Sequence, residues 1–205
     1  MVPRFLPSWR LSHAGALRVQ TALLPRVRLV PLVAGPRLVA GCDVSFSGPA
    51  HRMCAAVVLY DLRTRAAVET ALAVRPARWP YIPGLFSFRE LPPLIAAFRR
   101  LRSTPDLLLF DGHGTAHPRR FGLACHAGVL FDLPSVGCAK SVLVGSHLPP
   151  GPARGSWSPL VDGGETIGAA LRTRDRVAPV FVSAGHRIDL PGALEVVLAC
   201  GGGRR

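Results

Sequence analysis

The sequence has no long hydrophobic run and no paired cysteine motif. None of its apolar stretches reaches the ~18 residues that a membrane-spanning helix needs. Residues 1–10 contain basic side chains but neither a continuous apolar segment nor a small-residue cleavage site, so we expect no signal peptide. The five cysteines are scattered without a C-x-x-C pair, which argues against a zinc cage or a disulfide framework. Free thiols in a reducing cytoplasm are the simplest explanation.

Acidic residues are also scarce, with 12 Asp and Glu against 25 Lys and Arg, which gives a formal net charge of +13. Nearly all of these cations are arginines. A guanidinium group binds phosphate through two parallel hydrogen bonds, so the surplus favours a polyanionic partner such as nucleic acid. An arginine-rich genome would explain why arginines outnumber lysines, but it does not explain why basic residues outnumber acidic ones.

The length of 205 residues and the hydrophobic content of 49% suit one large domain, and we find no internal repeat. We predict an N-terminal helical arm over residues 1–36, a main domain over residues 37–200 and a flexible tail over residues 201–205. The apolar spacing in the arm is only roughly amphipathic, and Pro31 and Pro36 prevent a helix from continuing.

Three predicted strands begin the main domain, at residues 37–46, 53–60 and 67–74. Short polar turns join them, which indicates an antiparallel meander. The first strand reads as buried and carries Asp43 in its interior. Because an unpaired buried carboxylate is costly, Asp43 should have a metal ion or a cation as partner, and a salt bridge to arginine is the alternative.

Residues 79–84 predict a stiff loop, because two prolines restrict the backbone and Gly84 allows a sharp turn. We expect this loop to hold Tyr81 and Ile82, which precede Pro83, pointing outward. A rigid aromatic ring beside a basic surface can stack on bases or wedge between them. The alternative is that the same side chains pack the loop back onto the core.

The next segment predicts a helix, because Ser87 and Glu90 have the spacing of a capping box. Capping alone would account for Glu90. Pro92 and Pro93 come late for a first turn, so the helix could instead begin nearer Leu91. The apolar face of this helix is formed by Leu94, Ile95, Phe98 and Leu101.

Residues 107–110 form a short apolar run of strand length, and Asp111 follows this run directly. An aspartate at the C-terminal end of a buried strand lies where open α/β sheets bind their ligands. Gly112 and Gly114 allow other groups to approach the carboxylate closely. The histidine and arginines of residues 117–120 suit an anionic substrate. A strand followed by a polar turn without function is the alternative.

The rest of the chain alternates helices and strands with one long surface loop. The loop covers residues 145–159, which are rich in Gly, Pro and Ser. The expected helices and strands cover residues 119–131, 135–138, 165–171, 179–183 and 190–200.

Asp43, Glu90 and Asp111 have no evident structural role. A few carboxylates, together with water and phosphate oxygens, are the usual ligands of Mg²⁺. Such an ion polarises a phosphodiester and promotes attack by water. A three-stranded meander, a helix and a strand with an acid at its tip also follow the order of the ribonuclease H-like fold. We therefore expect a single-domain α/β protein whose mixed sheet is flanked by helices.

Five segments, which occur in order and cover roughly residues 38–198, resemble the endonuclease V family. One such segment would be weak evidence, whereas five in register are specific. The segments are residues 39–46, 81–90, 111–120, 137–141 and 181–187.

The resemblance implies a Mg²⁺-dependent endonuclease, with Mn²⁺ as a substitute, that acts on DNA containing deoxyinosine. Such enzymes nick the strand at the second phosphodiester bond 3′ to the lesion. By motif position, Asp43, Glu90 and Asp111 would hold the metal, and Lys140 would complete the catalytic set near the scissile phosphate. Inosine-containing RNA stays open as a substrate, and we expect a monomer.

The resemblance also implies a set of residues that contact the substrate. Tyr81 would fill the gap left by an extruded base, and His117 would lie close to the scissile phosphate. The glycines would let the backbone line the base pocket, whereas His186 is expected to be a structural histidine. The full set is Tyr81, Ile82, Pro83, Gly84, Gly112, His117 and Gly137.

The sequence departs from the family pattern after residue 200. The family usually continues into a segment with a proline-threonine-arginine core and a further acid or histidine near the metals, which residues 201–205 do not contain. This departure predicts weaker metal binding. The alternative function is therefore that of a nucleic-acid-binding protein, which binds the lesion but cleaves poorly. A structural domain with an incidental basic surface would require the three acids to lie far apart.

Overall fold

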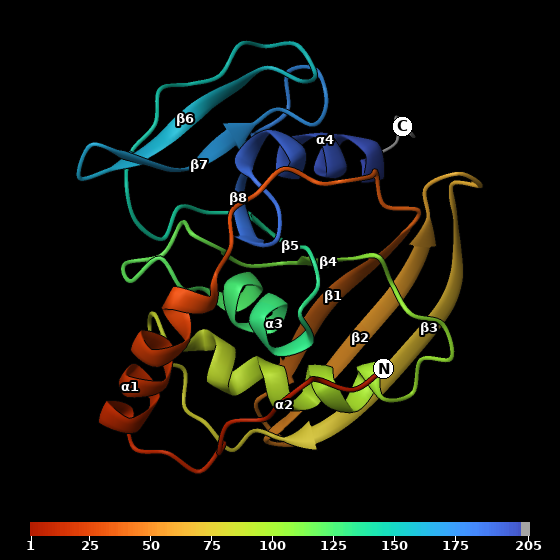
Figure 1. Cartoon of the computed structure of the whole chain (residues 1–205), viewed down its shortest axis with the longest axis vertical. Coiled ribbons are helices and arrows are strands. Elements are labelled where there is room, and N and C mark those ends of the chain that lie inside the picture. The colour runs from red at the N-terminus through yellow and green to blue at the C-terminus, as the bar shows by residue number, and fades with distance from the viewer. Residues whose placement is uncertain (202–205) are drawn as a thin grey trace.

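The computed structural model describes residues 1–201, in which one mixed sheet has helices on both faces (Figure 1). The strand order in this sheet is β3-β2-β1-β4-β5-β8-β7-β6. The fold class predicted from the sequence is confirmed. The strands are β1 (Leu38–Ser47), β2 (Arg52–Asp61), β3 (Ala66–Pro76), β4 (Leu107–Phe110), β5 (Ser135–Ala139), β6 (Trp157–Asp162), β7 (Glu165–Leu171) and β8 (Val180–His186).

Helices cover the two faces of the sheet unequally. On one face, α2 and α3 bury apolar side chains that include Cys42 and Phe110. On the other face, α4 packs over Val39, Leu107 and Val182. Successive residues of a strand point to opposite faces of the sheet. Val39 and Leu107 therefore lie in the core layer under α4, whereas Cys42 and Phe110 lie in the layer under α2 and α3. The helices are α1 (His13–Leu23), followed by a short 3-10 turn η1 (Leu24–Arg26), then α2 (Phe86–Phe98), α3 (Leu123–Phe131) and α4 (Leu190–Cys200).

The pairing of the central strands decides where the functional residues meet. β1, β2 and β3 form the predicted antiparallel meander, whereas β4 lies parallel to both β1 and β5. Cys42 is level with Phe110, and Phe110 is level with Gly137. The carboxyl ends of these three parallel strands therefore lie at one edge of the sheet, which is where such sheets place ligands.

The start of α2 differs from the prediction. The helix begins at Phe86 and no side chain caps it, so the capping box of Ser87 and Glu90 is wrong. Pro92 and Pro93 lie inside the helix and do not delay its start. An interior proline costs ~3 kcal/mol, but each large apolar side chain buried on the sheet contributes ~1.5–3 kcal/mol. The buried face of α2, with Phe88, Leu91, Leu94, Ile95 and Phe98, outweighs that cost.

Three other predicted boundaries shift. The N-terminal arm is helical only from His13 to Arg26. The helix predicted from residue 119 begins at Leu123, because Arg120 adopts a left-handed conformation with φ 54°. Residues 145–159 are not loop throughout, since β6 begins at Trp157 at the sheet edge, where Pro159 removes no essential hydrogen bond. Of the predicted tail, residues 202–205 lie outside the described residues.

No membrane-spanning helix was predicted from the sequence. Within residues 1–201, no helix is long and apolar enough to cross a bilayer.

Candidate active site

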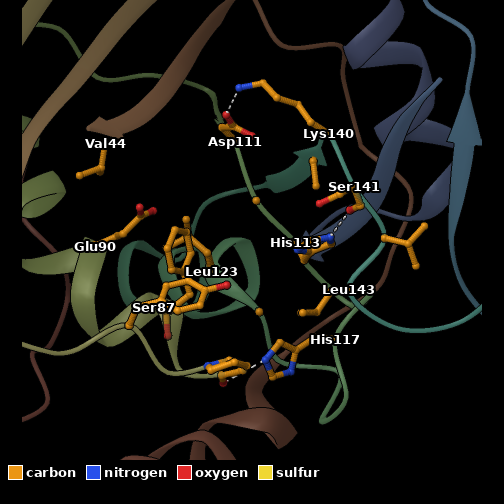
Figure 2. Close-up of a pocket in the computed structure, with 18 of the residues that line it drawn as sticks. Val44, Ser87, Glu90, Asp111, His113, His117, Leu123, Lys140, Ser141 and Leu143 are labelled. Carbon is orange, nitrogen blue, oxygen red and sulfur yellow. Dashed lines mark hydrogen bonds and ion pairs between the residues drawn. The ribbon is translucent and has the colours of Figure 1, made fainter. Parts of the chain in front are cut away.

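A cavity of about 300 Å³ lies at the carboxyl edge of β1, β4 and β5 (Figure 2). Its wall is built from the ends of these strands, the loop before α2, α2 itself, the start of α3 and one residue of α1. Most of the residues predicted to be functional line this wall, although they come from segments far apart in the sequence. These residues are Asp43, Tyr81, Pro83, Gly84, Glu90, Asp111, Gly112, His117 and Lys140.

Three carboxylates face the cavity with different exposure. Glu90 is only 6% exposed, and Figure 2 shows its side chain pointing from α2 towards the part of the cavity bordered by Val44 and Asp111. Burial, together with the negative charges of Asp43 and Asp111, raises the pKa of Glu90 to about 9. Asp43 is exposed, and one of its oxygens accepts a hydrogen bond from the Val44 amide at 2.8 Å. The prediction that Asp43 is buried is wrong, because the strand already leaves the core at this residue.

Lys140 lies across the cavity from Glu90. This only lysine of the sequence directly follows β5, and its ammonium group contacts Asp111 Oδ2 at 2.6 Å (Figure 2). The hydrogen bond to Asp111 raises the pKa of Lys140. Its side chain is 82% exposed, so the pair is reached by solvent and contributes little to stability. A cation is thus held beside Asp111, across the cavity from Glu90.

The donor set can be tested against a divalent metal ion. Three carboxylates around one cavity fit a hard cation, since carboxylate oxygens are its preferred ligands. The mutual repulsion that raises the pKa of Glu90 is what a bound cation would relieve. In the observed rotamers, no three Asp, Glu, His or Cys side chains among residues 1–201 are close enough to enclose an ion. Asp111 would first have to turn from Lys140.

The loop before α2 forms a tight turn over residues 82–85. The Leu85 amide donates to the Ile82 carbonyl at 2.9 Å, and Gly84 has φ 75°. Pro83 and Gly84 occupy the two central positions, as a type II turn prefers. Tyr81 is 64% exposed and rests its ring edge-on against Phe86. The outward orientation predicted for Tyr81 is therefore observed.

Ile82 and Gly137 do not line the cavity. Ile82 packs inward with Trp79 and Leu85, as the alternative expected. Gly137 lies beneath the segment that follows β4, where an added Cβ would lie 2.5 Å from the Gly114 amide nitrogen. Gly137 therefore permits close packing of two backbone segments and supports the cavity wall from behind.

His117 has both of its ring nitrogens engaged within the protein. Its Nε2 lies 3.0 Å from the Gly84 carbonyl oxygen (Figure 2), and its Nδ1 accepts from the Arg119 amide at 3.1 Å. Nε2 is therefore the protonated, donating nitrogen of a neutral ring. Burial, together with the positive charge of Arg119, lowers the pKa of His117 to about 4. His117 thus holds the turn at Gly84, and its predicted position close to the scissile phosphate stays a prediction.

Sequence reasoning missed several residues of the cavity wall. Gln20 reaches it from α1, and His113 places Nε2 at 3.0 Å from the Ser141 carbonyl oxygen (Figure 2). His113 lies within the segment 111–120 that resembles the family, so its position was available from the sequence. Gln20 gave no such signal, since its partners are 64 and 101 residues away.

His186 lies outside the cavity and is structural. It is buried, its Nε2 donates to Asp132 at 3.3 Å and its Nδ1 accepts from the Arg28 amide at 3.3 Å. This arrangement agrees with the role expected for it.

A third buried histidine, His126, stands directly behind the cavity. His126 Nδ1 lies 2.9 Å from Ser87 Oγ, and the ring is surrounded by Trp9, Phe88 and Phe121. Its Nε2 is the buried side-chain atom without a hydrogen-bond partner among the described residues. Burial lowers the pKa of His126 to about 3, from 6.5. His126 therefore stays neutral, because burial removes the water that would solvate a charged ring.

We expect His126→Phe to reduce the acid sensitivity of the fold. The folded-state pKa of His126 lies below the unfolded value, so its contribution is complete above pH 6.5 and is lost as the pH falls towards 3. For the wild type, the linkage between protonation and folding predicts that the free energy of unfolding is lower by ~2 kcal/mol at pH 5. Urea unfolding at pH 7 and pH 5 measures this difference. At pH 7, the free energy of unfolding of the variant should lie within ~1 kcal/mol of the wild-type value. If the free energy of unfolding fell equally in both proteins between pH 7 and pH 5, the assignment would be contradicted.

A basic groove of about 320 Å³ lies beside the loop that carries Tyr81. Its wall contains Arg10, Arg75, Arg78 and Arg89 together with Trp79, and no acidic residue lines it within the described chain. Arg89 donates to the Trp79 carbonyl at 3.2 Å. Among residues 1–201, the other three arginines form no ion pair. Guanidinium groups next to an aromatic ring suit phosphate and base contacts.

Comparisons with known proteins agree on one family. A family model described as Endonuclease V matches residues 21–205. The chain is 50% identical over 194 residues to Endonuclease V of Roseiflexus sp. (strain RS-1), which covers 94% of this chain and 86% of the relative. The crystal structure of Endonuclease V from Streptomyces avermitilis superposes with a TM-score of 0.92 at 42% identity, covering 100% and 91% of the two chains. The crystal structure of the catalytic domain of human Endonuclease V superposes with a TM-score of 0.86 at 34% sequence identity, covering 93% of this chain and 88% of that one.

Proposed function

This chain belongs to the endonuclease V family, and from that premise we propose that it nicks DNA at the second phosphodiester bond 3′ to deoxyinosine in a Mg²⁺-dependent reaction. The observation that carries the proposal is the cavity in which Asp43, Glu90, Asp111 and Lys140 meet beside an exposed Tyr81. Acids and a cation at one sheet edge suit phosphate chemistry, and a rigid exposed ring suits a base that has lost its stacking partner.

Asp43, Glu90 and Asp111 would hold Mg²⁺ or, as a substitute, Mn²⁺. When bound, the ion supplies positive charge that polarises the scissile phosphate and promotes attack by water. Glu90 contributes through its burial, because an ionised carboxylate in this position needs a cation. Lys140 contributes through its exposure, because a mobile ammonium group released from Asp111 can bind a phosphate oxygen.

The glycines and the turn would serve recognition of the base. Gly84 and Gly112 lie in the wall of the cavity and let a planar base approach the backbone. Pro83 restricts the turn before a substrate binds, and Ile82 anchors it to the core. Tyr81 would then fill the space of the extruded base. Extrusion costs a few kcal/mol, which such a wedge partly offsets.

One gel tests the proposal directly. Labelled single-stranded and double-stranded oligonucleotides, each with one inosine or with adenine instead, are incubated with Mg²⁺ or with EDTA. We expect a single Mg²⁺-dependent product, cut one nucleotide beyond the inosine, from the inosine strands alone. Specific binding without a product would favour the lesion-binding alternative, and products from the adenine strands would contradict lesion specificity. Inosine RNA in the same assay decides between the two nucleic acids.

The basic groove provides a separate prediction about binding. We expect Arg75→Ala combined with Arg78→Ala to weaken DNA binding several-fold and to reduce the log–log salt slope by ~2, since each lost phosphate contact reduces it by ~1. The matched control is Arg63→Ala combined with Arg65→Ala. These residues occupy the β2–β3 turn, ~30 Å from Arg75 along the hairpin. Equal effects in both variants would mean that total charge, and not the groove, determines binding.

Two further features of the protein are part of the proposal. All five cysteines are free thiols, which supports a cytoplasmic location. The protein is also proposed to act as a monomer, as expected from the sequence. The division into an arm, a main domain and a tail stays a prediction, although α1 of the arm contributes to the cavity.

A further inference from the structure

The Gly84 carbonyl oxygen accepts three hydrogen bonds from side chains. The donors are Gln20 Nε2 at 3.0 Å, His117 Nε2 at 3.0 Å and Arg119 Nη2 at 2.6 Å. On the other side of the same peptide unit, the Leu85 amide donates to Ile82. The peptide plane between residues 84 and 85 is thus held at both ends. Rotation of this plane, which would break the Leu85–Ile82 hydrogen bond that closes the turn and so release the segment that carries Tyr81, is opposed from both sides.

Gln20 connects this turn to two other elements. Its amide group also donates to the Phe121 carbonyl at 3.2 Å, just before α3, and its Oε1 accepts from Arg119 Nε at 2.8 Å. Gln20 is only 1% exposed. The amide can adopt only one orientation, because the reversed group would point an oxygen at two carbonyl oxygens. A buried amide with both hydrogens donated and its oxygen satisfied is a strong geometric constraint.

The sequence of α1 explains how a polar group comes to lie there. Ser12 caps the helix by accepting from the Gly15 amide at 3.2 Å. Ala16, Gln20 and Leu23 are spaced by four and three residues and form the buried face of α1. Gln20 is the polar residue of this otherwise apolar stripe. Figure 1 shows α1 packed at the side of α2 and α3, outside the sheet.

We propose that Gln20 is a positioning residue for lesion recognition, which fixes the Gly84 turn and thereby the orientation of Tyr81. This proposal rests on the proposed function, since recognition of inosine is what the turn would serve. It assigns a role in the site to the N-terminal arm, and to a residue that lies immediately before the segment matched by the family model.

Gln20→Glu is the sharpest substitution. It preserves the shape of the side chain and the contact with Arg119, but it replaces two donors with an oxygen that faces the Gly84 and Phe121 carbonyls. The matched control is Thr21→Glu, which adds the same charge to the exposed side of α1. Should Gln20→Glu fail to fold, Gln20→Met removes the same donors without adding charge.

Two measurements test the proposal. Hydrogen exchange of residues 81–87 without nucleic acid should be at least tenfold faster in Gln20→Glu, with exchange in β4 unchanged, whereas Thr21→Glu should match the wild type. The ratio of kcat/KM for inosine over adenine DNA should fall at least tenfold in the same variant. Wild-type exchange or a wild-type ratio would overturn the proposal. Because exchange is measured without substrate, a wild-type enzyme that cuts no inosine DNA would refute the proposed function separately.

Discussion

Replacing Asp43 or Asp111 with asparagine is expected to lower Mg²⁺-dependent cleavage of inosine DNA by ~10²–10³-fold or more, by comparison with the loss of one group that stabilises transition-state charge. Both carboxylates line the cavity with Glu90 and raise its pKa. Asparagine has the same shape but carries no negative charge, so the attraction for a divalent cation falls at the point where the phosphate becomes most charged.

Binding should respond differently to the same substitutions. Under the proposed function, phosphate contacts by the arginines of the basic groove determine affinity, and these residues lie outside the carboxylate cluster. We therefore expect the dissociation constant for inosine DNA in EDTA to stay within ~3-fold of the wild type, or to improve slightly because repulsion of the DNA decreases. Single-turnover cleavage and filter binding on one oligonucleotide measure both quantities.

Asp175→Asn is a suitable control for the carboxylate variants. Asp175 lies between β7 and β8, away from the cavity lining, and accepts a hydrogen bond from the Arg154 amide that asparagine can also accept. This variant should cleave like the wild type. Near-normal cleavage by Asp43→Asn or Asp111→Asn would remove these residues from the metal site, and equal losses in Asp175→Asn would indicate a general effect of charge or folding.

Local patterns predicted much of this architecture. The meander follows from three apolar runs separated by polar turns, and Asp111 follows an apolar run of strand length. Parallel pairing of β1 with β4 then brings Asp43 and Asp111 to one edge. The turn at Pro83 and Gly84 was also predictable, because backbone preferences alone favour it.

Features that depend on tertiary contacts were not predictable from local patterns. Ser87 has the residue type and spacing of a cap, but its hydroxyl instead contacts His126, 39 residues away. Pro92 and Pro93 are tolerated because α2 is held by the sheet. Gln20 looks like an ordinary helix residue until α1 is packed against the Gly84 turn. In each case the deciding partner is distant in the chain, where propensity carries no information.

The second large effect is expected at Tyr81. We predict that Tyr81→Ala lowers the selectivity for inosine over adenine DNA by ~10–100-fold, because stacking of one base on an aromatic ring contributes ~1–3 kcal/mol. General affinity for undamaged DNA should change less than ~3-fold, since the arginines of the groove are untouched. Stability should barely change, because the ring is 64% exposed and its aromatic contact is the edge of Phe86.

Tyr81→Phe separates the ring from its hydroxyl group. A wedge acts through the area and stiffness of the ring, which phenylalanine keeps, so this variant should retain most of the selectivity. Cleavage rates on paired inosine and adenine duplexes, together with binding to both, distinguish the possible roles. If Tyr81→Ala lowered cleavage of the two duplexes equally, the residue would be a generic DNA contact. If Tyr81→Phe lost as much selectivity as Tyr81→Ala, the hydroxyl group, and not the ring, would carry the effect. A selective loss in Tyr81→Ala alone is the result that a rigid wedge on a fixed type II turn requires, because the turn holds the ring in place before the base is extruded.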